Sequence, residues 1–598
     1  MKKIDILKER KDIDKKYLWK IEDLFETDLL WEEEFKSAAS ALEKLEEYAG
    51  RVSADNLFTL LQLKDSLAQR VEKLFVYASL RTNEDSTVAV YQALNDRGNQ
   101  LLTSFNEKTA FIEPEIIALG EGILEKCEGS VLEVYKHYLS ELFRNQQHIL
   151  SPEKEALLAA FGDVASAPST IYSRLNNADL KFNDITDKDG VAHSLTHGNF
   201  ISFMQHSDRV LRKNAFNSFY DSYKALANTI GATYNSSVKT DWLYSSLRGF
   251  SSTLEGSLFA DNIPTGVYHS LIDTVNENIG VMHKYVALRK KALGLSDLNI
   301  YDIYATLVED FDTSISFDEA FETVLEALKP LGEEYISVLR DSYSQGWIDI
   351  YENKGKRSGA YAWGVYGSHP FVSLNFNDTI DAMFTLAHEM GHAMHSYYTW
   401  GNQPYIYGDY TIFVAEVAST VNEALLMNYL LRTTTDINKK KYLINYFMEQ
   451  FRGTLFRQTM FAEFELIAHE MVESGEPLTF ESLSEKYMAL NRKYFGEDIE
   501  LDEKISWEWC RIPHFYTAYY VYQYATGYSC AIALSKLIEE GKSENYLKFL
   551  KGGSCDYSIE LLKLAGVDIS TPAPVKAAIK VFEGLIDQMD TLLNKQEG

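Results

Sequence analysis

The stretch NDTIDAMFTLAHEMGHAMHSYYTWG, residues 377–401, decides how the fold of this chain is predicted. Its apolar residues recur at helical spacing. His388 and His392 stand four residues apart, so on a helix both imidazoles lie on one face and can reach a single metal ion. Glu389 lies one residue round the helix, where it cannot share the metal but can hold the attacking water. The pattern predicts a zinc centre on a helix, with Glu389 as general base and acid.

The segment before this helix predicts a strand. Residues 354–376 are rich in glycine and aromatic side chains, and their end, PFVSLNF, alternates like a strand with two different faces. If this strand lies at a sheet edge, it can pair with an extended peptide, and we expect Ser373 and Asn375 to contact that substrate. Asp378 is a candidate N-cap of the helix that follows, and Gly401 a candidate stop.

A catalytic zinc site usually has three protein ligands, so one more is needed. The next helical pattern, YTIFVAEVASTVNEALLMNYLL, carries Glu416 in apolar surroundings and Glu423 seven residues later on the same face. One of them could bind zinc while the other orients a ligand histidine. His395 is a rival ligand because it shares the face of His388 and His392. It lies a further turn along, however, and three successive turns do not easily converge on one ion.

A third feature is the aromatic stretch CRIPHFYTAYYVYQYATGYSC, residues 510–530. Its side chains with polar tips include His514, Tyr519, Tyr520, Tyr522 and Tyr524. Neutral donors of this kind can stabilise the oxyanion that forms when an amide is hydrolysed. On a helix the first and third of these tyrosines would share one side, and the second and fourth another. Spacing alone therefore leaves open which hydroxyls face the metal.

Composition predicts a helical protein. The chain has 598 residues, 46% hydrophobic and 24% charged, which are the proportions of a globular protein. Only 11 prolines and 33 glycines interrupt it, which favours long helices over a loop-rich β fold. We therefore expect a mainly α fold, a large multi-helix body with a small β-ribbon or sheet beside the helix of residues 377–401.

The helical patterns divide near residue 200. Amphipathic spacing runs from about residue 15 to 180, and the alternating stretch around Asp189 and Gly190 predicts a β-hairpin. Helical spacing then returns. We predict a helical N-terminal region over residues 1–199 and a catalytic region over residues 200–598.

Charge and the N-terminal sequence limit the partners. The formal net charge is −29, which argues against binding to nucleic acid or to an anionic membrane, because both need clustered Lys and Arg. The first residues, MKKIDILKERKDIDKKYLWK, contain no apolar core of a signal peptide, and no apolar run is long enough to span a membrane. We expect a cytoplasmic protein with no nucleic-acid or membrane partner.

Taken together, these motifs make the chain resemble oligoendopeptidase F, within the thimet-oligopeptidase-like zinc metallopeptidases. The resemblance rests on HEMGHAMH at 388–395, FVAEVASTVNEALL at 413–426, RIPHFYTAYYVYQYATG at 511–527 and SGAYAWGVYGSHPFVSLNF at 358–376. It covers nearly the whole chain. It implies a zincin-type helical body around a deep channel, which admits short peptides and excludes folded proteins.

The resemblance also implies roles for single residues. It makes His388, His392 and Glu416 the ligands of one Zn²⁺ ion and Glu389 the general base and acid, which leaves Glu423 to orient a ligand. The family's His/Tyr substrate group maps onto His514 and, more loosely, onto the tyrosines that follow. On that basis we expect His514, Tyr522 and Tyr524 to act in catalysis and Tyr519 to bind substrate.

Two other functions fit the same motif. A zinc carboxypeptidase or dipeptidase would need a group that holds the terminal carboxylate of its substrate, and Arg511 is a candidate. A noncatalytic peptide-binding protein with a structural zinc would need four protein ligands, often cysteine. No cysteine lies near His388 in sequence, although Cys510 or Cys530 could approach it in space. Manganese or cobalt could take the place of zinc at the site of His388 and His392.

Overall fold

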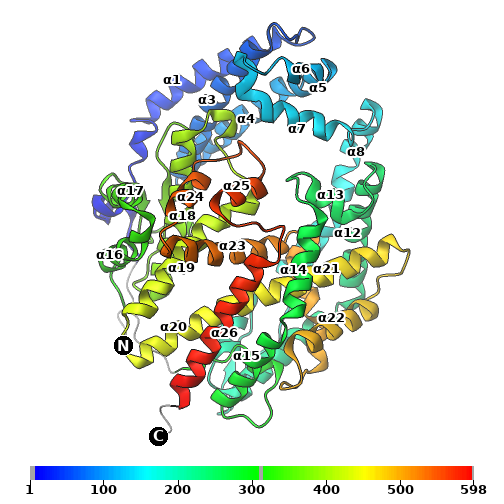
Figure 1. Cartoon of the computed structure of the whole chain (residues 1–598), viewed down its shortest axis with the longest axis vertical. Helices are drawn as coiled ribbons and strands as arrows, with labels where there is room; N and C mark the ends of the chain where they lie inside the picture. The colour runs from blue at the N-terminus through cyan, green and yellow to red at the C-terminus, as the bar shows by residue number, and fades with distance from the viewer. Residues whose placement is uncertain (1–6, 309–313, 595–598) are drawn as a thin grey trace. The chain divides into compact units, whose positions relative to one another are not determined.

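The computed structural model describes residues 7–308 and 314–594. The chain forms two compact units, each built from three separate stretches. The first unit comprises residues 1–147, 313–429 and 534–567, and the second comprises 148–312, 430–533 and 568–598. Both are mostly helical, as predicted (Figure 1). The division of the sequence at residues 199 and 200 stays a prediction.

The first unit holds the helix predicted to carry the metal. Its helices are α1 (Asp28–Ala41), α2 (Glu43–Glu46), α3 (Leu57–Glu84), α4 (Ala89–Thr109), α5 (Ile112–Ala118), α6 (Gly122–Glu125), α7 (Lys136–Gln146), α16 (Phe317–Leu328), α17 (Glu333–Ser344), α18 (Ile380–Asn402), most of α19 (Ile412–Thr433), α24 (Ser543–Leu550) and α25 (Ser558–Ala565). The helical spacing predicted between about residues 15 and 180 is seen in α3, where Leu60, Leu67, Val71 and Leu74 are buried.

The second unit holds the aromatic stretch of residues 510–530. Its helices are α8 (Pro152–Ala165), α9 (Ala167–Arg174), α10 (His197–Gln205), α11 (Arg209–Lys224), α12 (Ala227–Leu247), α13 (Thr253–Phe259), α14 (Thr265–Glu277), α15 (Gly280–Ala292), α20 (Ile437–Gln450), α21 (Arg457–Glu473), α22 (Phe480–Phe495), most of α23 (Tyr522–Glu539) and α26 (Ala573–Asn594). The predicted hairpin is confirmed as β1 (Ile185–Thr186) paired antiparallel with β2 (Ala192–His193), and Gly190 takes a positive φ of 79° in its turn. Among the described residues, none of the helices combines the length and apolar character that a membrane span requires.

A three-stranded sheet precedes α18 in the first unit. Its strands are β3 (Ile348–Asp349), β4 (Tyr361–Trp363) and β5 (Phe371–Ser373), in the order β3-β5-β4. The pair β3–β5 is parallel and the pair β4–β5 is antiparallel. The strand predicted within residues 371–376 is therefore central, and the condition under which it could pair with a peptide, a place at the sheet edge, is not met, because both of its sides are already paired.

Buried charges hold this sheet in place. Asp349 on β3 is fully buried, and its carboxylate forms ion pairs with two cations. Lys356 Nζ lies 2.7 Å from Asp349 Oδ1, and Arg10 Nη2 lies 2.6 Å from Asp349 Oδ2. Arg10 also donates to Glu84 on α3 at 2.8 Å. The network links the N-terminal segment, α3 and the sheet.

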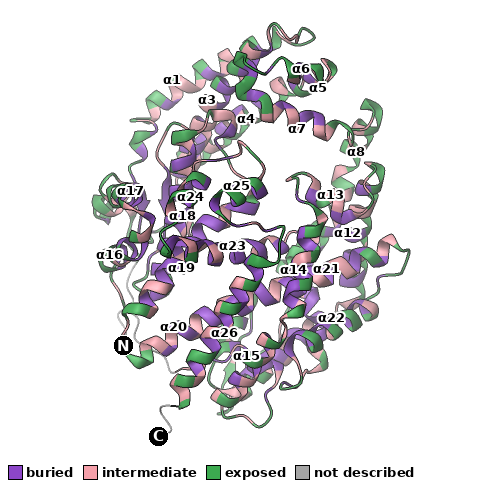
Figure 2. Cartoon of the chain, viewed as in Figure 1, coloured by how far each residue is buried: buried purple, intermediate pink, exposed green. Residues whose placement is uncertain are grey.

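The ends of α18 differ from the prediction. Thr379, not Asp378, is the N-cap, since the Thr379 side chain accepts the N–H of Ala382 at 3.1 Å. Asp378 takes a positive φ of 59° and lies outside the helix. The helix also continues past Gly401 and ends at Asn402. Of its 23 residues 13 are buried (Figure 2), so its middle can carry polar side chains only where these find partners.

Helices α18 and α19 approach each other at Gly391. A Cβ at this position would lie 2.6 Å from Ser419 Cα and 2.7 Å from the carbonyl oxygen of Ala418, closer than any side chain can be. Asn422 on α19 also donates from Nδ2 to the carbonyl oxygen of Ala387 at 3.1 Å, within the core. This backbone contact fixes the register in which α19 passes α18.

The second unit contains a buried ionic cluster around Glu508, in the 3-10 segment η10 (Glu503–Arg511). Glu508 Oε1 accepts from Arg457 at 2.7 Å and from Arg511 at 2.9 Å, and Oε2 accepts from the Tyr487 hydroxyl at 2.7 Å. Burial alone would raise the pKa of Glu508, but the charges of Arg457 and Arg511 outweigh it and lower the pKa to about 2. The charged form of this carboxylate therefore stabilises the fold.

We expect Glu508→Gln to change how stability depends on pH. An unfolded glutamate titrates near about 4.3, well above the pKa of Glu508 in the folded chain. The stability that Glu508 contributes is present above that unfolded value and is lost as the pH falls toward the folded one. Over this acid range the free energy of unfolding should fall more steeply for the wild type than for the variant, by about 1.4 kcal/mol per pH unit.

Near neutral pH the same variant should be less stable by roughly 3 kcal/mol, because Arg457 and Arg511 lose a buried counter-charge. Urea unfolding at a series of pH values measures both effects. Glu503→Gln is the matched control, since Glu503 is exposed on the same segment. Parallel pH curves for the wild type and Glu508→Gln would contradict the assignment of this ionic cluster.

Candidate metal centre

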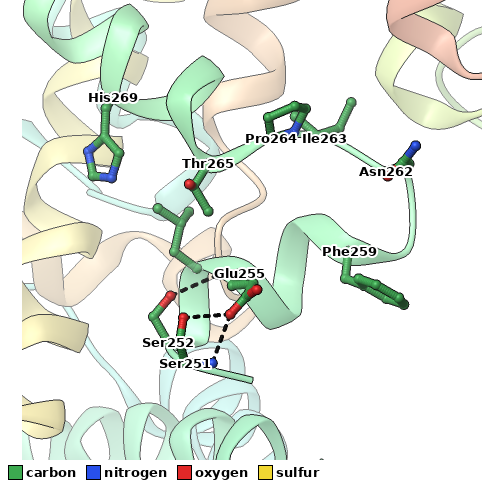
Figure 3. Close-up of a pocket in the computed structure, with 10 residues that line it drawn as sticks. Ser251, Ser252, Glu255, Phe259, Asn262, Ile263, Pro264, Thr265 and His269 are labelled. Carbon is green, nitrogen blue, oxygen red and sulfur yellow. Dashed lines mark hydrogen bonds between the residues drawn. The ribbon is translucent and has the colours of Figure 1, made fainter. Parts of the chain in front are cut away.

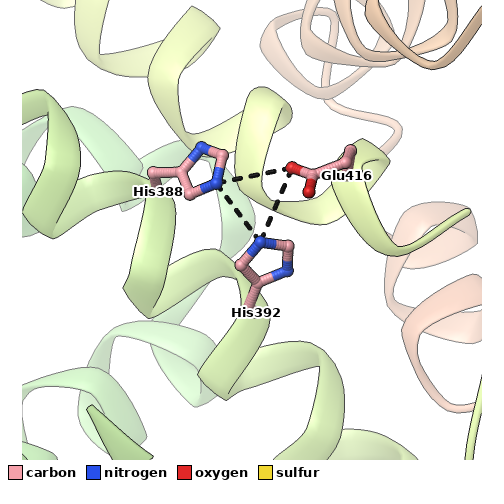
Figure 4. A group of neighbouring side chains, drawn as sticks. All are labelled: His388, His392 and Glu416. Carbon is pink, nitrogen blue, oxygen red and sulfur yellow. Dashed lines mark hydrogen bonds and ion pairs between the residues drawn. The ribbon is translucent and has the colours of Figure 1, made fainter. Parts of the chain in front are cut away.

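Three side chains from α18 and α19 converge on one point in the first unit (Figure 4). The Nε2 atoms of His388 and His392 lie 3.2 Å apart. Glu416 Oε2 lies 3.4 Å from His388 Nε2 and 3.6 Å from His392 Nε2. Within the described part of the chain, this is the one group of three or more His, Cys, Asp or Glu side chains with ligand atoms close enough to share an ion.

Glu423 contacts the far side of the His388 ring. His388 Nδ1 and Glu423 Oε1 lie 2.6 Å apart, which leaves Nε2 directed at Glu416 and His392. Burial would lower the pKa of His388, but the hydrogen bond and charge of Glu423, with Glu389 and Glu416, raise it to about 9. A carboxylate in this position selects the imidazole tautomer whose Nε2 is free to bind a metal.

Glu416 is half-exposed, and it is held in place by Ser419. The Ser419 hydroxyl donates to Glu416 Oε2 at 3.0 Å and is itself buried. The hydrogen bond from His392 is the main reason that the pKa of Glu416 falls to about 2, against a burial effect that raises it. Glu416 is therefore an anion over the whole neutral range. Sequence reasoning missed Ser419, although its position three residues after Glu416 on a helix was the available signal.

Glu389 lies beside this group with little exposed surface, 7%. Burial raises the pKa of Glu389 above its ordinary value, while the charges of His388 and His392 and the N–H of Ala362 on β4 lower it in part. A carboxyl group with a raised pKa accepts and returns a proton more readily near neutral pH. The side chain is thus suited to general base and acid chemistry.

His395 lies in the core. It is 1% exposed, and its ring stacks on Tyr410 with centroids 3.7 Å apart and planes 7° apart. Burial lowers the pKa of His395 to about 3, so its imidazole is neutral. His395 does not belong to the group of possible metal ligands. Its packing favours the sequence argument against it as the third ligand.

The donor set fits one divalent cation of the zinc type. Two imidazole nitrogens and one carboxylate oxygen are ligands that catalytic zinc sites use, and they leave a coordination position for water. Structural zinc sites are normally closed by four protein ligands. The described residues supply three donors here, which favours a catalytic centre over a structural one.

The aromatic stretch of the second unit is not a single helix. The 3-10 segment η11 (Pro513–Tyr516) is followed by an irregular turn, and α23 begins only at Tyr522. The assumption that the tyrosines share helical faces is therefore wrong for residues before 522. Tyr519 takes a positive φ of 55°, which a non-glycine residue rarely adopts.

His514 lies with two tyrosines in the second unit. Its ring is parallel to that of Tyr520, with centroids 6.0 Å apart, and edge-on to that of Tyr524 at 5.9 Å. Tyr520 and Tyr524 also meet edge to face at 5.5 Å. His514 is exposed and both tyrosines are partly exposed. Tyr520 is one of the candidate donors of the aromatic stretch, but the sequence assigns it no catalytic or substrate-binding role, because spacing leaves open which hydroxyls face the metal.

Tyr519 and Tyr522 lie elsewhere in the second unit. They are 2% and 1% exposed, and both rings pack against Tyr268, with centroids 5.3 and 5.2 Å away. The structure therefore lends no support to a catalytic role for Tyr522 or a substrate-binding role for Tyr519, because neither ring has a surface to offer.

Ser373 and Asn375 make contacts within the sheet and its neighbouring loop. Ser373 on β5 is 1% exposed and lies opposite Tyr361 of β4. The Asn375 amide donates to the carbonyl oxygens of Arg357 and Gly359, at 3.0 and 2.7 Å. Their contact with a substrate stays a prediction. Two outer strands flank them, β3 on one side and β4 on the other.

Arg511, the candidate carboxylate-binding group of an exopeptidase, already has a partner. Its guanidinium donates to Glu508 at 2.9 Å, and it lies over the rings of Phe200 and Phe219. A cation neutralised within the core is poorly suited to bind the C-terminus of a peptide.

A pocket of about 430 Å³ lies in the second unit, lined by residues of α13 and α14, the loop between them and two serines just before α13 (Figure 3). Its acidic group is already engaged, because Glu255 accepts from the Ser251 N–H at 2.8 Å and from the Ser251 hydroxyl at 2.6 Å. The described residues that line it include none of the predicted site residues.

Comparison with known proteins agrees with the geometry. Residues 202–581 match peptidase family M3, and residues 115–182 match the family called Oligopeptidase F. The chain belongs to peptidase family M3. Oligopeptidase PepF of Bacillus subtilis is 44% identical to this M3 peptidase, with 99% of this chain and 90% of the relative aligned. Group B oligopeptidase PepB of Streptococcus agalactiae is 39% identical, with 98% of each chain aligned.

A solved structure supports the same conclusion. Oligoendopeptidase-F from Enterococcus faecium is 35% identical to this M3 peptidase and superposes with a TM-score of 0.72, covering 95% of this chain and 99% of that one. The resemblance drawn from the sequence motifs is confirmed. The M3 peptidase is a metalloendopeptidase that hydrolyses peptides.

We expect Glu416→Gln to weaken metal binding while His395→Phe does not. Loss of a group that only orients a ligand typically costs roughly 10- to 100-fold in affinity, and loss of a ligand should cost more. His395→Phe keeps a ring against Tyr410 and removes no ligand. Competition titration with a chromophoric chelator measures both affinities, and circular dichroism checks folding. The reverse result, with metal lost only in a folded His395→Phe protein, would overturn the ligand assignment.

Proposed function

We propose that this M3 peptidase is a zinc endopeptidase that cleaves internal peptide bonds of short oligopeptides. The observation that carries the proposal is the convergence of His388, His392 and Glu416 next to Glu389. In this proposal the first three hold one Zn²⁺ ion and Glu423 orients His388. The names of the relatives, oligopeptidase and oligoendopeptidase, support the substrate class.

Zinc, when bound, supplies Lewis acidity, which lowers the pKa of water and polarises the scissile carbonyl. The chain's own residues do the rest. Glu389 accepts the proton of the attacking water and delivers it to the leaving amine. Its raised pKa supports both steps, since the group can be protonated and deprotonated within one turnover. Glu423 accepts from His388 Nδ1, which leaves Nε2 as the nitrogen that would hold the ion after it releases its proton.

We assign the donors for the oxyanion to His514, Tyr520 and Tyr524. Two phenol hydroxyls and an imidazole in mutual contact form a set of neutral donors, and such donors stabilise charge that develops on the scissile carbonyl oxygen. The family resemblance, which places a His/Tyr substrate group at His514, supports the same assignment. In this assignment Tyr520 takes the place of the predicted Tyr522, and Tyr524 keeps the role predicted for it.

We assign the backbone of the substrate to β4. This strand is outermost in the described sheet and contacts β5 on one side only. The N–H of Ala362 interacts with Glu389, so the free side of the strand adjoins the catalytic carboxyl group. An extended peptide that pairs with β4 would be recognised through its main chain, which suits broad side-chain specificity.

Two alternatives are weaker. A carboxypeptidase needs a free cation, and the candidate Arg511 is paired with Glu508. A noncatalytic protein with structural zinc needs four ligands and has no use for a buried general base, yet this group offers three ligands and Glu389. The cytoplasmic location stays a prediction.

We expect Glu389→Gln to retain zinc and to lose nearly all activity. Glutamine has the size of glutamate but cannot accept the proton of water, so kcat should fall by roughly 10²- to 10⁴-fold. An internally quenched peptide blocked at both termini gives kcat, and elemental analysis gives zinc, manganese and cobalt content. Because the termini are blocked, the same assay separates an endopeptidase from an exopeptidase. Near-normal turnover by the zinc-loaded variant would contradict the role of Glu389 as general base and acid.

We also expect a limit on substrate. A peptide must be extended to pair with β4, and a folded protein cannot extend without local unfolding, which typically costs several kcal/mol. Short unstructured peptides meet little of this cost and should be cleaved rapidly, and the family resemblance implies a length of roughly five to twenty residues. The measurement is a peptide ladder beside one stably folded protein, with and without chelator. Chelator-sensitive digestion of the folded protein at internal sites would make the enzyme a general protease.

A further inference from the structure

Tyr519 marks a strained point in the turn between His514 and Tyr520. Its φ of 55° places a non-glycine residue in the left-handed region, which persists only where surrounding contacts enforce it. Its ring is fixed between two others, edge-on to Tyr268 at 5.3 Å and tilted on His469 at 4.7 Å. The strain therefore sits at the residue next to Tyr520, which is part of the group around His514.

A buried carboxyl group holds the backbone of Tyr519. The Tyr519 N–H donates to Glu465 Oε1 at 2.6 Å. Glu465, on α21, is 0% exposed, and no cation in the described part of the chain forms an ion pair with it. Burial raises the pKa of Glu465 well above its ordinary value, so the group is neutral. Burying a neutral carboxyl group in the core costs less free energy than burying an anion. The hydrogen bond from Tyr519 is the side-chain contact that satisfies Oε1 of this polar group.

The rest of the turn is held at its ends. Phe515 packs in the core against Phe461 and Phe464 of α21. The Thr517 N–H donates to the carbonyl oxygen of His514 at 2.9 Å, and the Tyr520 N–H donates to that of Thr517 at 3.3 Å. Between these bonds the chain reverses at Tyr519. Glu465 thus supplies the tertiary contact at the point where the direction of Tyr520 is decided.

We infer that Glu465 is a positioning residue for the peptidase reaction: by binding the Tyr519 N–H, it holds the turn that places Tyr520 against His514. The inference rests on the proposed function of His514, Tyr520 and Tyr524. It assigns to Glu465 no contact with substrate or metal. Its effect passes through the backbone of the turn, so it should change turnover rather than zinc binding.

Three variants test this inference in the zinc-loaded full-length enzyme. Glu465→Met removes the acceptor at similar volume and should lower kcat for a blocked quenched peptide at least tenfold, with zinc content unchanged. Glu465→Gln keeps an acceptor oxygen and should retain activity within about threefold. Glu463→Met is the matched control, because Glu463 lies on the same helix but contacts Asn276, Lys493 and Tyr494 instead. It should leave kcat unchanged.

A double-variant cycle separates positioning from a general loss of stability. If Glu465 acts through the Tyr520 hydroxyl, Glu465→Met should cost less than twofold in a Tyr520→Phe background. Equal losses in both backgrounds, or a Glu465→Gln protein as inactive as Glu465→Met, overturn the inference. So does wild-type kcat in Glu465→Met.

The same set distinguishes failure of the underlying proposal. If Tyr520→Phe, Tyr524→Phe and His514→Ala all turn over like the wild type, the proposed oxyanion donors are wrong, whatever Glu465 does. If Tyr520→Phe loses activity and Glu465→Met does not, the donors stand and the inference about Glu465 falls alone.

Discussion

The closest approach of two helices sets the geometry on which the metal centre depends. Where α18 passes α19, the only room at position 391 is for a hydrogen atom, because the backbone of Ser419 fills the place of a Cβ. That contact brings Glu416 within 3.4 Å of His388 Nε2 and 3.6 Å of His392 Nε2, although 28 and 24 residues separate it from these histidines in sequence. A larger residue would move α19 outward by more than a hydrogen bond can stretch.

The polar groups around this contact are mutually dependent. Glu423 fixes the ring of His388, and Ser419 fixes the carboxylate of Glu416. Asn422 ties the two helices together between them. In a core of low polarity each of these contacts is strong, and each group left without its partner would be costly. The centre therefore tolerates few substitutions, even at positions that touch no metal.

The metal centre was predictable because its signals are local. Two histidines one turn apart and two glutamates two turns apart project from helices whatever surrounds them. The cap of α18 and the pairing of β5 were not, since both depend on distant or unusual backbone. Asp378 has a left-handed backbone conformation, so Thr379 is the N-cap instead. One side of β5 is paired with β3, a strand of two residues, which is too short for periodicity to reveal. Sequence named Tyr520 as a candidate but could not assign its role, because the left-handed Tyr519 breaks the helix that the tyrosine spacing suggested.

Arg10 carries a consequence for how this protein is handled. It is one of two cations that pair with the buried carboxylate of Asp349. Asp349 lies on β3, which is paired with the central strand β5. A protease that clips the chain just beyond Arg10, or a leader fused there that pulls the segment away, leaves Asp349 and Glu84 short of a counter-charge inside the core. Such a nicked enzyme keeps every ligand and every catalytic group, yet loses the support under the strands that precede α18. An intact catalytic motif is therefore no proof of an intact peptidase.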